Sequence, residues 1–125
     1  HAIESNNTFI VCHSDKSPEQ CGVSEVNSLG EVIRSFVGKE QINDPTYLSF
    51  DSVGRVLVRV GRKVVLMSKE LKNERVLLDI SSDIDTTRTA RDAWQRINYK
   101  KETNKLIVNV NYSDASSDLL IYNWK

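Results

Sequence analysis

Two short segments carry the same turn chemistry, and they constrain the fold more than any other feature of the chain. Residues 27–33 read Asn-Ser-Leu-Gly-Glu-Val-Ile, and residues 51–57 read Asp-Ser-Val-Gly-Arg-Val-Leu. In each segment Asn or Asp begins a tight turn, Gly supplies a positive φ, and a run of aliphatic and β-branched residues follows. This is the pattern of a β-hairpin. We therefore predict that Gly30 and Gly54 occupy positive-φ positions and that small antiparallel sheets repeat along the chain.

The repeat is longer than the turn. Segments 3–11, 47–58 and 97–108 each contain an apolar strand start, a polar turn and a compact apolar strand. Their last residues lie roughly 47 and 50 positions apart, within the range of β-propeller blades. Together with the strands that follow, the pattern predicts an all-β chain of about eleven strands in three antiparallel sheets. Third strands are expected at residues 22–26, 63–68 and 119–124, and fourth strands at 31–36 and 74–79.

The middle unit resembles an NHL repeat. The similarity covers the segment from Pro45 to Val58 and residues 62–67, which read Arg-Lys-Val-Val-Leu-Met. It extends more weakly to residues 9–13 (Phe-Ile-Val-Cys-His) and 92–97 (Asp-Ala-Trp-Gln-Arg-Ile). The resemblance implies three blades of four antiparallel strands, which form part of a six-bladed β-propeller. The expected blades span residues 1–44, 45–91 and 92–125.

NHL propellers are usually binding platforms for proteins or RNA, so the resemblance implies a non-enzymatic binding or scaffold module for a protein, peptide or RNA. Some relatives are enzymes, the amidating lyases, which carry metal ligands inside the central channel. Part of such an enzyme is therefore an alternative, and a carbohydrate-binding propeller is another. One departure from the family is clear, because Val60-Gly61-Arg62 stands where the family usually has Asn-His-Arg before the third strand. This changes one face of the blade, where recognition often occurs.

Three blades alone do not close a propeller, which usually has four to eight. An isolated set would expose apolar surface at both ends, and such surface promotes aggregation. We therefore expect a partner that completes the ring. A second copy of the chain would give six blades, and another polypeptide that supplies the missing blades is the alternative. A crescent that does not close is a third option, which we rank last.

Composition narrows the function classes. Apolar residues make up 39% of the chain and charged residues 27%, and the formal net charge is zero. A neutral chain is a poor candidate for bulk nucleic-acid binding, although a local basic patch stays open. No segment approaches the roughly 18 apolar residues of a membrane-spanning helix, and no signal-peptide pattern is present. We expect no cofactor, and the sequence does not identify a compartment.

The clearest basic cluster, and our candidate ligand-binding set, contains Arg55, Arg59, Arg62 and Lys63. Arg55 and Arg59 are four positions apart in an expected strand, which puts them on one sheet face. Such a cluster can bind phosphate or an acidic protein surface. The alternative, which we favour, is a solvated strand edge whose charges discourage unwanted pairing.

Cys12 and Cys21 flank a turn-rich segment and are expected at facing ends of neighbouring strands. A cross-strand disulfide is one interpretation, and two buried thiols are the other. A metal site from these residues and His13 lacks the paired short spacing of structural zinc, so we expect no metal. His13 is the only internal histidine, and nothing indicates an activated nucleophile beside it. We therefore expect no catalytic residues and no enzyme.

The remaining signals are weaker. Asn6 and Asn111 begin glycosylation sequons, which matter only if the chain is secreted. Aromatic residues at strand positions are expected to pack between blades, although Trp124 is open to a ligand-stacking role. Residues 81–96 lack strand patterning and are interpreted as a loop with at most one helical turn, and any short helix is expected only here, at 87–94.

Overall fold

The prediction of an all-β chain is confirmed. The computed structural model describes residues 2–5 by their backbone, and residues 7–14, 21–37, 45, 47–72, 75–81, 83–84 and 96–124 in full. These residues form eleven strands in three antiparallel sheets and contain no helix. The short helix expected at 87–94 lies outside the described residues.

Each sheet is a meander in which consecutive strands pair, and each lies within one of the three expected units. The first sheet contains β1 (Ala2–Ser5), β2 (Thr8–His13), β3 (Gly22–Asn27) and β4 (Val32–Val37). The second sheet contains β5 (Tyr47–Phe50), β6 (Val56–Val60), β7 (Lys63–Met67) and β8 (Arg75–Asp79). The third sheet contains β9 (Ile97–Lys100), β10 (Lys105–Asn111) and β11 (Ser117–Asn123).

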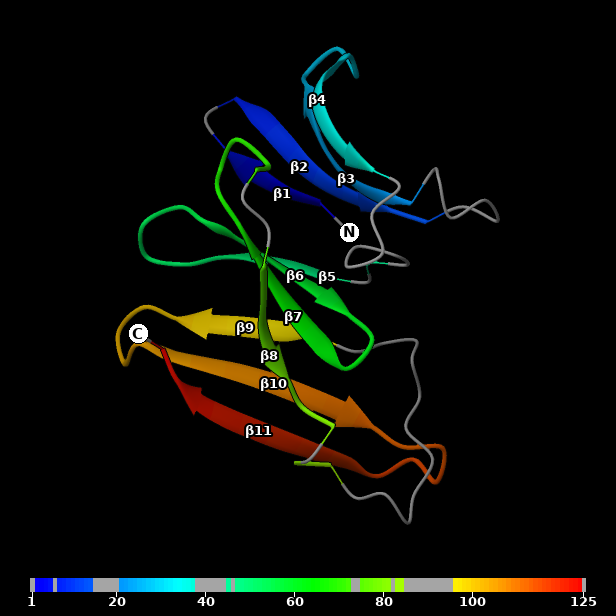
Figure 1. Cartoon of the computed structure of the whole chain (residues 1–125), viewed down its shortest axis with the longest axis vertical. Coiled ribbons are helices and arrows are strands. Elements are labelled where there is room, and N and C mark those ends of the chain that lie inside the picture. Colours follow the sequence, from blue (N-terminus) through cyan, green and yellow to red (C-terminus); the bar gives the residue numbers. More distant parts are fainter. Residues whose placement is uncertain are drawn as a thin grey trace.

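The three sheets follow one another along the long axis of the molecule, with the second in the middle (Figure 1). The first strands of neighbouring sheets lie close together, β1 beside β5 and β5 beside β9. A radial arrangement of blades requires this closeness, because it brings the same strand of every blade nearest to the axis. The fold is therefore consistent with part of a blade arrangement.

Both faces of the second sheet are buried. Val56 and Val58 of β6 pack towards the first sheet, whereas Leu57 between them packs towards the third. Such burial explains why β6 and β7 are nearly continuous apolar runs, since alternation with polar residues occurs only where one face meets water. The first cluster contains Ile10, Cys12, Val23, Leu48, Val56, Val58, Val65, Met67 and Leu71. The second contains Leu57, Val64, Leu66, Ile80, Ile84, Ile97, Leu106, Val108, Val110 and Tyr112.

The turns that begin at Asn27 and Asp51 have the same geometry. Gly30 N–H donates to the Asn27 carbonyl at 3.0 Å, and Gly54 N–H donates to the Asp51 carbonyl at 3.2 Å. The φ angles of the two glycines are 81° and 83°, as predicted. Each leading side chain also accepts two backbone N–H bonds, which is why Asn or Asp starts the turn. The first turn joins β3 to β4 and the second joins β5 to β6.

Two further hairpins use this turn without glycine. The same backbone bond joins Leu71 N–H to the Ser68 carbonyl and Ala115 N–H to the Tyr112 carbonyl, at 2.9 and 3.1 Å. Leu71 and Ala115 have φ angles of 60° and 68°, a region that favours glycine. The turn therefore recurs four times among the described residues, and only two copies carry the residue by which it is recognised in a sequence.

The fourth strands of the first two sheets each contain a β-bulge. In β8, Val64 pairs with Leu78 and Val65 pairs with Val76, so Leu77 is an extra residue. In β4, the pairing steps past Ile33 in the same way. A bulge bends the strand and changes where its side chains point. As a result Leu77 and Leu78, although consecutive, both line the space between the second and third sheets.

Candidate binding surfaces

The structure separates the four residues of the basic cluster. Arg59 is fully buried, with 0% exposure, on the face of β6 that meets the third sheet. Its Nε donates to the Gly61 carbonyl at 2.6 Å, and its Nη1 donates to the Arg96 and Asn109 carbonyls, both at 3.1 Å. Neither interpretation of the cluster describes Arg59, because it is neither an exposed ligand-binding residue nor part of a solvated edge. It joins two sheets.

Arg55 is held by the turn that precedes β6. Its Nε donates to Asp51 Oδ2 at 2.6 Å, and the Asp51 side chain is completely buried while that of Arg55 is 37% exposed. Arg55 comes before the strand, which begins at Val56. Its charge is therefore largely balanced by a buried carboxylate, although the outer part of the guanidinium reaches solvent.

Arg62 and Lys63 lie exposed at the turn between β6 and β7. Lys63 of β7 lies directly opposite Asp79 of β8 in the strand register. Hydrogen bonds from Ser81 lower the pKa of Asp79, and the charges of Lys63 and Arg62 lower it further. A carboxylate thus accompanies the exposed basic pair, so the predicted cluster does not form one positive surface.

Neither cysteine is in a disulfide bond, and both are buried. Cys12 faces the first apolar cluster and pairs with Val23 on β3, whereas Cys21 precedes that strand. Of the two interpretations, the structure contains two buried thiols and not the disulfide. Burial raises the pKa of the Cys12 thiol, because the apolar surroundings disfavour the thiolate.

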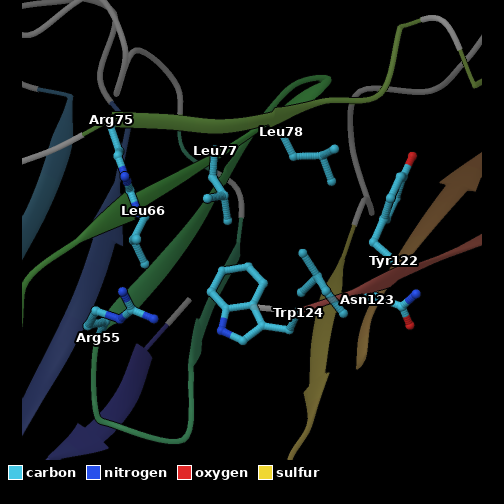
Figure 2. A pocket seen from close by; sticks show the side chains of 9 residues that line it. Arg55, Leu66, Arg75, Leu77, Leu78, Tyr122, Asn123 and Trp124 are labelled. Carbon is cyan, nitrogen blue, oxygen red and sulfur yellow. The ribbon is translucent and has the colours of Figure 1, made fainter. Parts of the chain in front are cut away.

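A cavity of about 270 Å³ lies between β8 of the second sheet and the end of β11 in the third (Figure 2). Arg55 and Arg75 stand at one end, Tyr122 stands at the other, and Trp124 lies between them. The sequence did not predict this cavity, because it depends on the bulge at Leu77 and on the packing of two sheets. The lining residues are Arg55, Leu66, Arg75, Leu77, Leu78, Leu106, Tyr122, Asn123 and Trp124.

Contacts with the hairpin between β9 and β10 hold Trp124 in place. The backbone N–H of Trp124 donates to the backbone carbonyl of Asn104 at 3.0 Å. The side-chain amide of Asn104 donates to the backbone carbonyl of Trp124 at 2.6 Å. The ring also packs edge-on against Tyr99, with 5.9 Å between ring centroids. Trp124 therefore packs as expected of a strand aromatic, and it also presents part of its ring to the cavity.

The outer face of the first sheet carries apolar side chains. Ile10 and Cys12 point into the core, so Phe9 and Val11 point outwards by the alternation of β2. Phe9 is 39% exposed, and Val32 of β4 is 63% exposed. No described strand covers this face.

The outer face of the third sheet is mixed, because a few apolar side chains stand among Lys, Asn and Ser at the outward positions of β10 and β11, and it is hollowed. Ile107 of β10 pairs directly with Ile121 of β11, and Leu119 lies beside them. Leu119 and Ile121 are 67% and 61% exposed. A hollow of about 250 Å³ opens on this face, beside Tyr47 and Arg96. It is lined by Tyr47, Arg96, Ile97, Asn98, Ile107, Asn109 and Leu119.

Of the predicted sequons, Asn111 lies half-buried at the end of β10, and Asn6 lies outside the described residues. The residues that the structure describes contain no group of three His, Cys, Asp or Glu side chains able to hold a metal ion. They also contain no helix of the length and apolarity needed to cross a membrane.

No protein-family model matches the chain, and a search of the curated proteins finds no match either. The resemblance to NHL repeats therefore stays a prediction.

Proposed function

We propose that the chain is a non-enzymatic binding module that works as half of a six-bladed β-propeller, completed by a second copy of itself. The observation that carries the proposal is the set of exposed apolar side chains on the outer faces at the two ends of the stack. The second sheet has a sheet against each face, whereas the first and third sheets each have one face without a neighbour among the described strands.

Each outer face carries exposed apolar side chains among polar ones. Phe9, Val32, Leu119 and Ile121 all lie on sheet faces and keep at least 39% of their surface exposed. Removal of apolar surface from water contributes about 25 cal/mol of favourable free energy per Å². Burial of these side chains under a second sheet would therefore stabilise the assembly. A large apolar patch on a soluble domain commonly marks an interaction site.

The proposed contact brings a projecting side chain of one face opposite a hollow of the other. Phe9 projects from the first sheet, and the third sheet has a hollow of about 250 Å³ beside Leu119. In a ring of two copies, the first sheet of each would face the third sheet of the other. One two-fold axis then generates both contacts, so the assembly closes and does not grow into a filament.

A protein or peptide ligand suits the module better than RNA. RNA binding depends strongly on an exposed positive surface, because the phosphate backbone dominates affinity. Here Arg59 is buried, Arg55 is paired with Asp51, and the chain has no net charge. We therefore propose polypeptide recognition.

The assembly is tested by its mass in solution. Light scattering or sedimentation at micromolar concentration is expected to give the mass of two chains. Ile121→Lys would place a charge in the proposed contact and is expected to produce monomers. Val53→Lys is the matched control, since Val53 is 71% exposed but lies in a hairpin turn away from both outer faces.

A monomer at all accessible concentrations would contradict completion by a second copy. A dimer that survives Ile121→Lys would contradict the proposed contact and leave another interface to be found. Circular dichroism of each variant checks that the sheets are intact.

A further inference from the structure

The third sheet differs from the other two at its outer edge. In the first sheet β4 pairs with β3, and in the second sheet β8 pairs with β7. β11 is the corresponding third strand, and among the described residues it pairs only with β10. One edge of β11 (Ser117–Asn123) therefore offers backbone N–H and C=O groups to a further strand.

The cavity lined by Trp124 lies beside this edge. It extends from β11 to β8, which occupies in the second sheet the place that no described strand occupies in the third. Leu77 and Leu78 form one wall because of the bulge, and Leu106 also lines the cavity. Side chains from a strand paired with β11 would alternate between the outer face and this cavity.

Charge favours one kind of segment. Arg75 lies at the cavity wall, and in the described part of the chain no acidic side chain forms an ion pair with it. Arg55 donates to Asp51 through Nε, so its two Nη atoms stay available. They lie at the end of the cavity where Arg75 also lies (Figure 2). No carboxylate is among the described residues that line the cavity. The site is therefore apolar with a net positive end.

We propose that the edge of β11 binds an extended segment of another polypeptide, which adds as a fourth antiparallel strand. Apolar side chains at alternate positions fill the cavity against Trp124 and Leu77, and an acidic side chain lies beside Arg75. Main-chain hydrogen bonds supply affinity in this mode, and the pocket supplies specificity. The inference rests on the proposed binding function and names its site.

The probe is a synthetic seven-residue peptide of alternating threonine and leucine with one central glutamate, labelled for fluorescence anisotropy. It is expected to bind the whole chain, and replacement of glutamate by lysine is expected to weaken binding by up to about fivefold, the range of an exposed ion pair. Proline at two alternate positions removes backbone donors and is expected to weaken binding by about tenfold or more.

Two protein variants locate the site. Arg75→Glu is expected to reverse the preference, so that the lysine peptide binds better than the glutamate peptide. Arg62→Glu is the matched control, because Arg62 is exposed but lies outside the cavity, and it is expected to keep the original preference. In a Trp94→Phe background Trp124 is the sole tryptophan, and its emission is expected to shift when the peptide binds.

Absence of binding, or binding that neither proline nor charge alters, would overturn the proposal. Binding without a change in Trp124 emission would overturn it as well, since the peptide would then lie elsewhere. The mass of the chain is measured in the same samples. A dimer that binds no peptide contradicts this inference alone, whereas a monomer that binds the peptide contradicts the proposed ring alone.

Discussion

Arg59 Nη1 donates a hydrogen bond to the Asn109 carbonyl, 3.1 Å away, and so joins the second sheet to the third. The same nitrogen also reaches the Arg96 carbonyl, and Nε reaches the Gly61 carbonyl. A buried charge is costly unless it is well bonded, and the planar guanidinium can serve several acceptors at once. Arg59 therefore holds two sheets in a fixed relation.

Arg59→Lys is expected to destabilise the fold by about 2–4 kcal/mol, because one ammonium group cannot reach all three carbonyls and leaves buried acceptors unpaired. Urea unfolding followed by circular dichroism measures the change. Arg62→Lys, at an exposed position, is the control and should stay within about 0.5 kcal/mol of the parent. Equal midpoints for the two variants would show that Arg59 is not the joint described here.

Gly54→Val is expected to destabilise by about 1 kcal/mol or more, because valine at a φ of 83° is strained. A Cβ at this position meets no atom within 4 Å, so the loss would come from the backbone and not from a clash. Thermal unfolding measures it. A parental melting temperature would contradict the turn assignment.

Ala115→Gly is expected to change stability in the opposite direction from Gly54→Val, in the same kind of turn. Ala115 is exposed and has a φ of 68°, so glycine relieves strain there and is expected to stabilise by up to about 1 kcal/mol. Ser113→Gly is the matched control, because Ser113 does not have a positive φ, and it is expected to destabilise slightly. Destabilisation by both changes would count against the shared turn geometry.

Gly22→Ala is expected to cost roughly 2 kcal/mol or more, since overpacking against backbone cannot be relieved by a side-chain rotation. A Cβ at Gly22 would lie 2.1 Å from the Phe36 carbonyl oxygen and 2.8 Å from the Val37 Cα. Chemical unfolding measures the loss, and Gly54→Ala is the comparison without a clash. If the two variants lose the same stability, β3 and β4 do not approach as closely as described.

We expect the buried thiol of Cys12 to make the fold less stable at alkaline pH. Burial raises the folded-state pKa of its thiol, so above about pH 8.5 the unfolded chain loses this proton first. The unfolded state is thereby favoured as pH rises. Urea unfolding at pH 7.5 and 9.5 should show the fall, and Cys12→Val should reduce it. An unchanged pH dependence in the variant would mean that Cys12 does not contribute.

Strand order, sheet number and two of the turns were predictable, because they follow from local patterns. Alternation and the Asn or Asp with Gly turns place most strands to within a residue or two. Leu71 and Ala115 were missed as positive-φ residues, since tertiary structure imposes that conformation on side chains that do not favour it.

The burial of Arg59 was missed for a different reason. A count of nearby basic residues places it in a surface cluster, whereas its neighbours Val58 and Val60 belong to a run that is apolar on both faces. Such a run indicates a strand that is covered on both faces. The sequence therefore did indicate that Arg59 is buried, but its position among other basic residues led to the surface assignment. The cavity gave no signal of this kind, because it arises where two sheets meet.

We expect the bulge in β8 to let that strand lose one residue without a change of register. Loss of one residue from a regular strand turns every following side chain to the opposite face. Leu77 is the residue without a partner, so its deletion would instead bring Val76 and Leu78 into register opposite Val65 and Val64. Arg75 would keep its place opposite Leu66. Homologous chains one residue shorter at this point can therefore lose Leu77 from the cavity and still keep Arg75, Val76 and Leu78 opposite their present partners on β7.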